Sequence, residues 1–293
     1  MSGELFHGAA TALVTPFRSG AVDYAALKRL AEYQVDHGAD ALVVSGTTGE
    51  APTLSALEKL KCVSAVAEAV RGRVPVIAGT GTNDTGFSSR LSKLAAREGA
   101  DAILAVAPYY NKPTGEGMIR HFTKIAEASG KPVIVYNIPS RTGCDISDDT
   151  YEALARSGTV CGIKEASGSV SRAAELIRRF GDRLDLYSGN DDLTLPLLSV
   201  GAKGVISVAS NVLPLEMHLL CSLWFDKKFD ECRALYYELL PFMHALFRES
   251  NPIPVKAAMD YLGFCGGELR LPMTPAKPET AENIVKCLKP LLG

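Results

Sequence analysis

A lysine inside an apolar run is the first feature of this sequence that suggests chemistry. Segment 160–169 reads VCGIKEASGS, and Lys164 follows the strand-like residues 160–163. A buried ammonium group costs free energy unless it is paired or loses its proton. A lysine with a lowered pKa is a nucleophile that attacks a ketone and forms a Schiff base. The structural alternative is a lysine at a strand end that reaches solvent.

Other polar side chains follow other apolar runs. Thr47 and Thr48 lie in a turn whose hydroxyls and backbone amides suit a small carboxylate. Tyr136 can transfer a proton, and Arg141 can bind a second carboxylate through two hydrogen bonds. Taken singly, these residues read as a helix cap, a packed tyrosine and a surface charge. Together with Lys164 they outline a lysine-dependent aldolase that acts on a 2-oxo acid.

The elements that must position these residues are indicated by eight short apolar runs. Amphipathic segments separate the runs, which recur about every 20 to 35 residues. The runs are TALVTPF, ALVVSGTTGE, VPVIAGTG, AILAVAPYY, PVIVYNIP, VCGIKEAS, LDLYSGND and GVISVAS. Apolar runs that alternate with helical segments are typical of parallel strands in βα units. The pattern predicts a (β/α)8 TIM barrel, in which the carboxyl ends of the strands meet on one face.

Helix signals support this fold and also suggest a C-terminal extension. Segments 24–38 and 85–99 are amphipathic, and their final glycines, Gly38 and Gly99, stand where a helix commonly ends. We expect the barrel to occupy residues 1–224 and a helical region to occupy residues 225–293. A dinucleotide-binding sheet is disfavoured because no GxGxxG follows the first run.

The composition excludes other classes of protein. The net charge is −2 over 293 residues, with no long basic run, which disfavours binding to nucleic acid or to a membrane surface. We find no membrane span and no signal peptide. Seven cysteines without CxxC spacing predict reduced thiols and a cytoplasmic location. The five histidines form no HxH or HxxxH pair, so we predict no metal site.

Four motifs, in chain order, resemble those of the dihydrodipicolinate synthase family of pyruvate-dependent class I aldolases. They are GTTGE (46–50), PYYNKP (108–113), YNIPSRTG (136–143) and GIKEASG (162–168). The likeness continues to NPIPVK (251–256) and LRLPMTP (269–275). The resemblance implies a lyase of diaminopimelate and lysine biosynthesis. It would condense pyruvate with L-aspartate 4-semialdehyde and cyclise the product, without a cofactor or a metal.

The same resemblance assigns catalytic roles. Lys164 would form the Schiff base with pyruvate, and Tyr136 would donate and accept the proton. Thr47 would connect Tyr136 to Tyr110, which in this family comes from the neighbouring subunit. The implied assembly is a homotetramer, a dimer of dimers, although a dimer also supplies the neighbouring tyrosine.

Binding roles follow in the same way. Thr48 would hold the pyruvate carboxylate beside the backbone of Ile206, and Arg141 would bind the carboxylate of the semialdehyde. N-acetylneuraminate lyases and 2-keto-3-deoxy-sugar-acid aldolases share the lysine and the tyrosine but generally have a neutral residue at the position of Arg141, which favours the synthase. A catalytically silent binding barrel is a further alternative, disfavoured because every expected catalytic side chain is present.

Many members of this family are inhibited by L-lysine, bound at a subunit interface. At the matching positions this chain has Ala51, Pro52, Ala56, Lys59, Asn83, Phe87 and Tyr109. Phe87 replaces the glutamate that would hold the ammonium group of the effector, and Lys59 adds a cation nearby. We therefore predict weak or absent inhibition by L-lysine.

Overall fold

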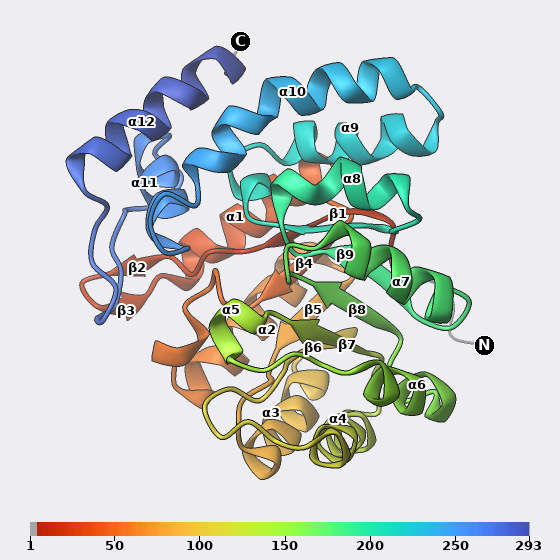
Figure 1. Cartoon of the computed structure of the whole chain (residues 1–293). Coiled ribbons are helices and arrows are strands. Elements are labelled where there is room, and N and C mark those ends of the chain that lie inside the picture. Colours follow the sequence, from red (N-terminus) through yellow and green to blue (C-terminus); the bar gives the residue numbers. More distant parts are fainter. Residues whose placement is uncertain (1–4, 293) are drawn as a thin grey trace.

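Eight parallel strands form a closed barrel at the centre of the molecule (Figure 1). The computed structural model describes residues 5–292. The barrel strands are β1 (Gly8–Ala12), β4 (Ala41–Val44), β5 (Val76–Gly79), β6 (Ala102–Val106), β7 (Val133–Asn137), β8 (Gly162–Glu165), β9 (Asp185–Ser188) and β10 (Gly204–Ser207). β1 pairs with both β4 and β10 and so closes the sheet. The predicted (β/α)8 fold is confirmed.

Helices surround the strands (Figure 1). They are α1 (Tyr24–Asp36), α2 (Ala56–Val70), α3 (Thr85–Arg97), α4 (Gly115–Ser129), α6 (Asp148–Ser157), α7 (Val170–Phe180), α8 (Thr194–Ser199) and α9 (Pro214–Phe225). Side-chain oxygens cap several of their N-termini, and Ser55 and Glu58 form a reciprocal capping box at the start of α2. Gly38 and Gly99 follow α1 and α3 with φ of +87° and +102°, a conformation that glycine adopts without strain.

The strands separate two apolar layers. A large cluster packs between strands and helices, and a smaller one fills the barrel. Side chains alternate along a strand, and Tyr136 of β7 pairs in register with Lys164 of β8. Tyr136 belongs to the inner cluster, so Lys164 also points inward, while the next residues, Asn137 and Glu165, point toward the helices. This register brings the two central candidate residues together inside the barrel.

A C-terminal helical extension packs beside the barrel, as predicted. It contains α10 (Phe229–Ala245), α11 (Ile253–Tyr261) and α12 (Pro278–Leu288). α10 packs on α9, and α12 packs on α10 and α11 (Figure 1). The proposed division between residues 224 and 225 lies inside the last turn of α9. The remaining short elements are the hairpin β2 (Phe17–Arg18) and β3 (Ala21–Val22), α5 (Pro139–Thr142), η1 (Ala51–Thr53), η2 (Asp191–Leu193), η3 (Ala209–Asn211) and η4 (Lys289–Leu291).

One expected strand lies elsewhere. The run TALVTPF covers residues 11–17, whereas β1 begins at Gly8 and ends at Ala12. The sequence GAATA has low intrinsic strand propensity, yet all five of its residues are buried between two neighbouring strands. Leu13 and Val14 are equally buried but belong to the segment that leaves the barrel. Burial rather than strand propensity therefore accounts for the position of β1.

Candidate active site

A cavity of about 230 Å³ lies among the segments that follow β4, β5, β6 and β7. Its lining includes three predicted site residues, Thr47, Tyr136 and Arg141. In a parallel barrel the carboxyl ends of the strands form the usual catalytic face. A larger hollow, of about 980 Å³, lies between α11 and α12 and is lined by none of the predicted site residues.

Lys164 lies beside this cavity with only 5% of its surface exposed. Its Nζ atom lies 4.4 Å from the centroid of the Tyr136 ring. Gly189, at the end of β9, leaves room for the lysine: a Cβ atom there would lie 2.6 Å from the Ala166 side chain and 3.2 Å from Cε of Lys164. The side chain is thus enclosed and directed at the tyrosine.

Burial shifts the acid–base properties of both groups. Desolvation lowers the pKa of Lys164 from 10.5 to about 8, with Asp191 opposing the shift and Arg141 adding to it. Desolvation also raises the pKa of Tyr136 to about 12, and the positive charge of Arg141 and the hydroxyl of Thr47 partly offset this. Lys164 is therefore far easier to deprotonate than a lysine in water, and Tyr136 remains a neutral phenol at physiological pH.

Asp191 is an acidic neighbour of Lys164 to which the sequence pattern alone gave no role. It is almost fully buried, and its Oδ2 atom accepts hydrogen bonds from the backbone amides of Val208 and Ala209 at 3.1 and 3.0 Å. Burial raises the pKa of Asp191, and the proximity of Lys164 lowers it. The available sequence signal was the position of this acid at the end of the seventh run, LDLYSGND.

Thr48 is held from the C-terminal region. Its Oγ1 atom accepts a hydrogen bond from Nδ2 of Asn251 at 3.0 Å, and both residues are buried. Arg141, which is otherwise exposed, donates from Nη2 to the backbone oxygen of Asn251 at 3.1 Å. One asparagine therefore contacts both predicted carboxylate-binding residues. Sequence reasoning noted the NPIPVK motif but assigned no role to its asparagine.

Glu50 anchors the same turn to the same region. Its carboxylate forms a buried ion pair with Lys256 of α11 and accepts a hydrogen bond from the backbone amide of Arg270 at 3.0 Å. Ser45 and Glu50, at the two ends of the turn, have φ of +57° and +55°, which is unfavourable for residues other than glycine. External contacts therefore support a turn whose backbone conformation is intrinsically disfavoured.

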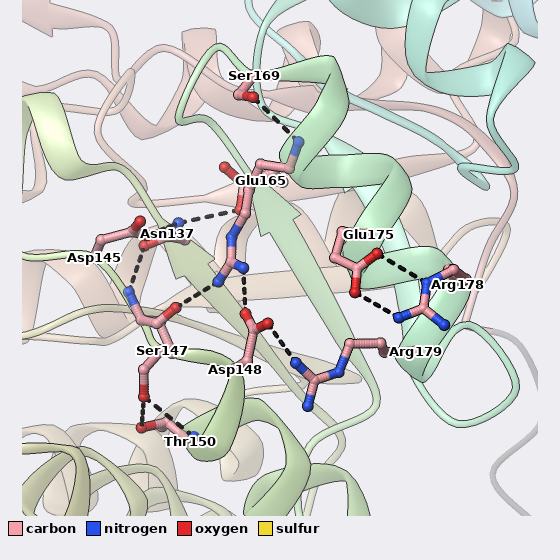
Figure 2. Close-up of polar contacts among 12 residues, drawn as sticks. Asn137, Asp145, Ser147, Asp148, Thr150, Glu165, Ser169, Glu175, Arg178 and Arg179 are labelled. Carbon is pink, nitrogen blue, oxygen red and sulfur yellow. Dashed lines mark hydrogen bonds and ion pairs between the residues drawn. The ribbon is translucent and has the colours of Figure 1, made fainter.

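A polar network lies behind the site, between β7, β8 and the neighbouring helices (Figure 2). The Asn137 amide donates to Asp145 at 2.7 Å and to Glu165 at 3.1 Å, and its oxygen accepts from the backbone amide of Ile146 at 3.3 Å. Glu165 also accepts from the backbone amide of Ser167 at 2.7 Å. Asn137 thus ties the end of β7 to the end of β8 and to the segment that follows α5.

The same network continues to the start of α6. Asp148 forms ion pairs with two arginines of α7, Arg172 and Arg179. Figure 2 labels Asp148 and Arg179 and marks the contact between them. Arg172 also donates to the backbone oxygen of Ile146 at 2.9 Å. The segment 138–147, which carries Arg141, is therefore fixed at both of its ends.

Two predicted site residues are placed differently from the rest. Ile206 is fully buried in β10, in the same inner cluster as Tyr136. Tyr110 is 90% exposed, with φ of +70°, and does not line the cavity. Within a single chain, Lys164 therefore lies against Tyr136, and Thr47, Tyr136 and Arg141 line one cavity that Tyr110 does not reach.

Residues 5–292 contain neither a cluster suited to a metal ion nor a helix suited to crossing a membrane. No group of three or more His, Cys, Asp or Glu side chains in this part of the chain is arranged to hold a metal ion. Within the same residues, no helix has the length and apolar character needed to cross a membrane.

Comparison with known proteins identifies the family. A model of the "Dihydrodipicolinate synthetase family" matches residues 5–291. A "4-hydroxy-tetrahydrodipicolinate synthase" from Pelobacter propionicus is 46% identical over 285 residues, covering 97% of this chain and 98% of that protein. One from Syntrophobacter fumaroxidans is 48% identical over 275 residues, covering 94% of each chain.

Solved structures agree. The crystal structure of dihydrodipicolinate synthase from Aquifex aeolicus superposes with a TM-score of 0.95 at 44% identity, covering 98% of each chain. The resemblance read from the four sequence motifs is confirmed, and the chain belongs to the dihydrodipicolinate synthetase family.

Proposed function

We propose that this protein acts as a 4-hydroxy-tetrahydrodipicolinate synthase, with pyruvate as its first substrate and L-aspartate 4-semialdehyde as its second. The observation that carries the proposal is the buried Lys164, whose pKa is lowered to about 8 and whose Nζ atom lies over the Tyr136 ring. The barrel that holds this pair belongs to the dihydrodipicolinate synthetase family. The relatives favour this activity over sugar-acid cleavage.

The reaction begins with the neutral amine of Lys164. It attacks the ketone carbon of pyruvate, and loss of water from the resulting carbinolamine gives an iminium ion. Tyr136 transfers the protons that this step requires, because its phenol lies next to the lysine and keeps its proton at neutral pH. The Thr48 hydroxyl and nearby amides hold the pyruvate carboxylate.

The second substrate then enters from the open side of the cavity. Loss of a proton from the methyl carbon of the iminium ion gives an enamine, which attacks the aldehyde carbon of the semialdehyde. Arg141, on the exposed rim, binds the carboxylate of that substrate. The substrate's own amine then attacks the iminium carbon, which closes the ring and releases Lys164.

The exposure of Tyr110 supports an assembly in which a second copy completes the site. We infer a homotetramer built from two dimers, in which this tyrosine reaches Thr47 of the neighbouring chain. A dimer alone meets the same requirement. The product would serve diaminopimelate and lysine biosynthesis in the cytoplasm, a location in keeping with seven free cysteines.

A substrate panel tests the proposal. Pyruvate and L-aspartate 4-semialdehyde are supplied to the purified protein, with a reductase that consumes the cyclic product. Cleavage of N-acetylneuraminate and of 2-keto-3-deoxygluconate is measured in parallel. Turnover in the first assay alone is expected. Turnover of a sugar acid would retain the Schiff-base chemistry and overturn the choice of second substrate.

The variant Arg141→Ala tests whether Arg141 binds the carboxylate of L-aspartate 4-semialdehyde. Losing a charge-assisted hydrogen bond of about 1.5–3 kcal/mol lowers kcat/KM for the semialdehyde by roughly 10- to 150-fold. The value of kcat/KM for pyruvate should fall less, because Thr48 holds that carboxylate and loss of the Arg141 charge acts on pyruvate only by raising the pKa values of Lys164 and Tyr136. Equal losses for both substrates would remove Arg141 from its assigned role.

A further inference from the structure

The C-terminal region contributes a residue to substrate binding. We propose that Asn251 is a positioning residue that fixes the Thr48 hydroxyl as a hydrogen-bond donor to the pyruvate carboxylate. This inference rests on the proposed function above, in which Thr48 binds that carboxylate. It adds a residue from outside the barrel to the determinants of affinity for the first substrate.

The contact is buried and joins distant parts of the chain. Nδ2 of Asn251 lies 3.0 Å from Oγ1 of Thr48, and the two residues are 203 positions apart. Asn251 is 6% exposed and Thr48 is 3% exposed. Water therefore cannot readily replace either partner, and the hydrogen bond acts in a low-dielectric environment.

The direction of this hydrogen bond determines what the threonine can do. A hydroxyl group has one hydrogen to donate and two lone pairs that accept. Because the Asn251 amide donates to Thr48, the hydroxyl hydrogen of Thr48 is not used in this contact. It is therefore available to a carboxylate oxygen, which can only accept. Without Asn251 the Thr48 hydroxyl would lose the donor that directs its hydrogen away from this contact.

Asn251 is itself well placed by its surroundings. Its backbone oxygen accepts from Arg141 at 3.1 Å, and the amide of Ile253 closes a turn on the oxygen of Ser250 at 2.9 Å. Lys256, on the first turns of α11, holds Glu50 at the other end of the threonine turn. Residues 251–256 therefore contact the threonine turn at two positions, Thr48 and Glu50.

The Oδ1 atom of the Asn251 side chain is evidence against a purely structural role for this residue. Its Oδ1 atom is buried and has no hydrogen-bond partner among the described residues. A buried acceptor without a partner destabilises the fold, so an apolar side chain would satisfy this position better. Asn211 shows the contrast: its side chain forms hydrogen bonds through both ends, to Val14, Ala12 and Val208.

The test compares Asn251→Ala, Thr48→Ala and the double variant in the full-length enzyme. In each, kcat/KM is measured separately for pyruvate and for the semialdehyde. We expect Asn251→Ala to lower kcat/KM for pyruvate by about three- to tenfold, the effect of one neutral hydrogen bond. The value for the semialdehyde should stay near that of the parent, because Arg141 contacts only the backbone of residue 251, which the variant keeps.

The double variant decides whether Asn251 acts through Thr48. If it does, Asn251→Ala has no further effect on pyruvate kinetics once Thr48→Ala is present. Asn251→Asp supplies an acceptor in place of the donor and captures the threonine hydrogen, so it should impair pyruvate use more than Asn251→Ala does. Asn211→Ala is the control for loss of a buried amide, and it should lower Tm without a pyruvate-specific effect.

The possible failures are distinguishable. If Thr48→Ala leaves kcat/KM for pyruvate unchanged, the proposed role of Thr48 is wrong. If Thr48→Ala impairs pyruvate use and Asn251→Ala does not, the inference about Asn251 is overturned. It is equally overturned if the two single effects are additive in the double variant, or if Asn251→Ala impairs both substrates to the same extent.

Discussion

The side-chain amide of Asn137 donates a hydrogen bond of 3.1 Å to the carboxylate of Glu165, across the two strands that carry Tyr136 and Lys164. Each partner directly follows one of these two residues, and the register pairs Asn137 with Glu165 as it pairs Tyr136 with Lys164. The contact on the outer face of the barrel therefore helps to fix the separation of the lysine and the tyrosine on the inner face.

Asn137→Asp tests this relationship. The variant has nearly the same shape but loses both amide donors and places a third carboxylate between Asp145 and Glu165. We expect kcat to fall about tenfold or more at pH 8.

The matched control is Asp145→Asn, which removes a charge but keeps an oxygen that can accept from Asn137. Its kcat should stay within about threefold of the parent. Parent-like kcat for Asn137→Asp at pH 8 would show that the outer network does not position the catalytic pair.

The lowered pKa of Lys164 sets the pH dependence of the first chemical step. Below pH 8 most of the lysine is protonated, so the rate of Schiff-base formation should rise about tenfold per pH unit and level off above pH 8. Single-turnover mixing with pyruvate measures this rate. Borohydride reduction should leave a stable pyruvate adduct on Lys164 in mass spectrometry. An adduct on another residue, or none in active protein, would refute the assignment.

The same shift carries a cost in stability. The folded-state pKa of Lys164, about 8, lies below the unfolded value of 10.5. Between these two pH values the unfolded chain therefore binds more protons than the folded protein. Stability therefore rises with pH across this window, and below pH 8 the buried ammonium costs up to about 3 kcal/mol. Lys164→Met should be inactive yet more stable than the parent at pH 7, with the difference shrinking above pH 10. Urea unfolding at both pH values measures this, and a less stable variant at pH 7 would contradict it.

Tyr136→Phe separates proton transfer from nucleophilic attack. The ring and its packing against Lys164 remain, but the phenol is lost. We expect kcat to fall by about 10²- to 10⁴-fold, the usual contribution of a general acid or base. Slow trapping of the pyruvate adduct on Lys164 should persist. Undiminished kcat would assign the proton transfer to another group.

The amine of Lys59 disfavours binding of the cationic effector L-lysine beside it. Its side chain is 7% exposed and lines the cavity together with Ala51, Pro52 and Tyr109. Burial lowers the pKa of Lys59, and this side chain places a basic group where a cationic effector would have to bind. We predict that L-lysine at micromolar concentrations leaves activity unchanged in a steady-state titration. Strong inhibition in that range would show that the positions were matched wrongly.

The sequence predicts most of the fold because buried parallel strands require long apolar runs. Seven of the eight runs contain their strand, and the polar residues after them line or adjoin one cavity. The pattern did not locate β1, because its sequence GAATA has a low preference for strands. These residues form a strand because they are buried between two neighbouring strands. Local composition therefore predicts a strand where the residues of that segment favour the extended conformation. It fails where contacts with neighbouring strands determine the conformation.

Contacts between distant segments lie outside the reach of such patterns. Asn251 approaches Thr48 from 203 positions away, and no spacing in the sequence encodes that meeting. Asp191 follows the seventh run like the predicted site residues, but its proximity to Lys164 depends on the packing of β9 against β8. Residue types and their positions after the strands therefore suggest which side chains lie near the cavity, and they do not reveal the distant residues that contact those side chains.

The late position of these supports has a consequence for synthesis on the ribosome. All barrel strands have been translated once Ser207 is added, but the threonine turn acquires its partners only with Asn251, Lys256 and Arg270. In the order of synthesis, the barrel strands therefore precede every residue that holds the threonine turn from the C-terminal region. A chain truncated before Asn251 would keep all eight strands but would lack these partners of the threonine turn.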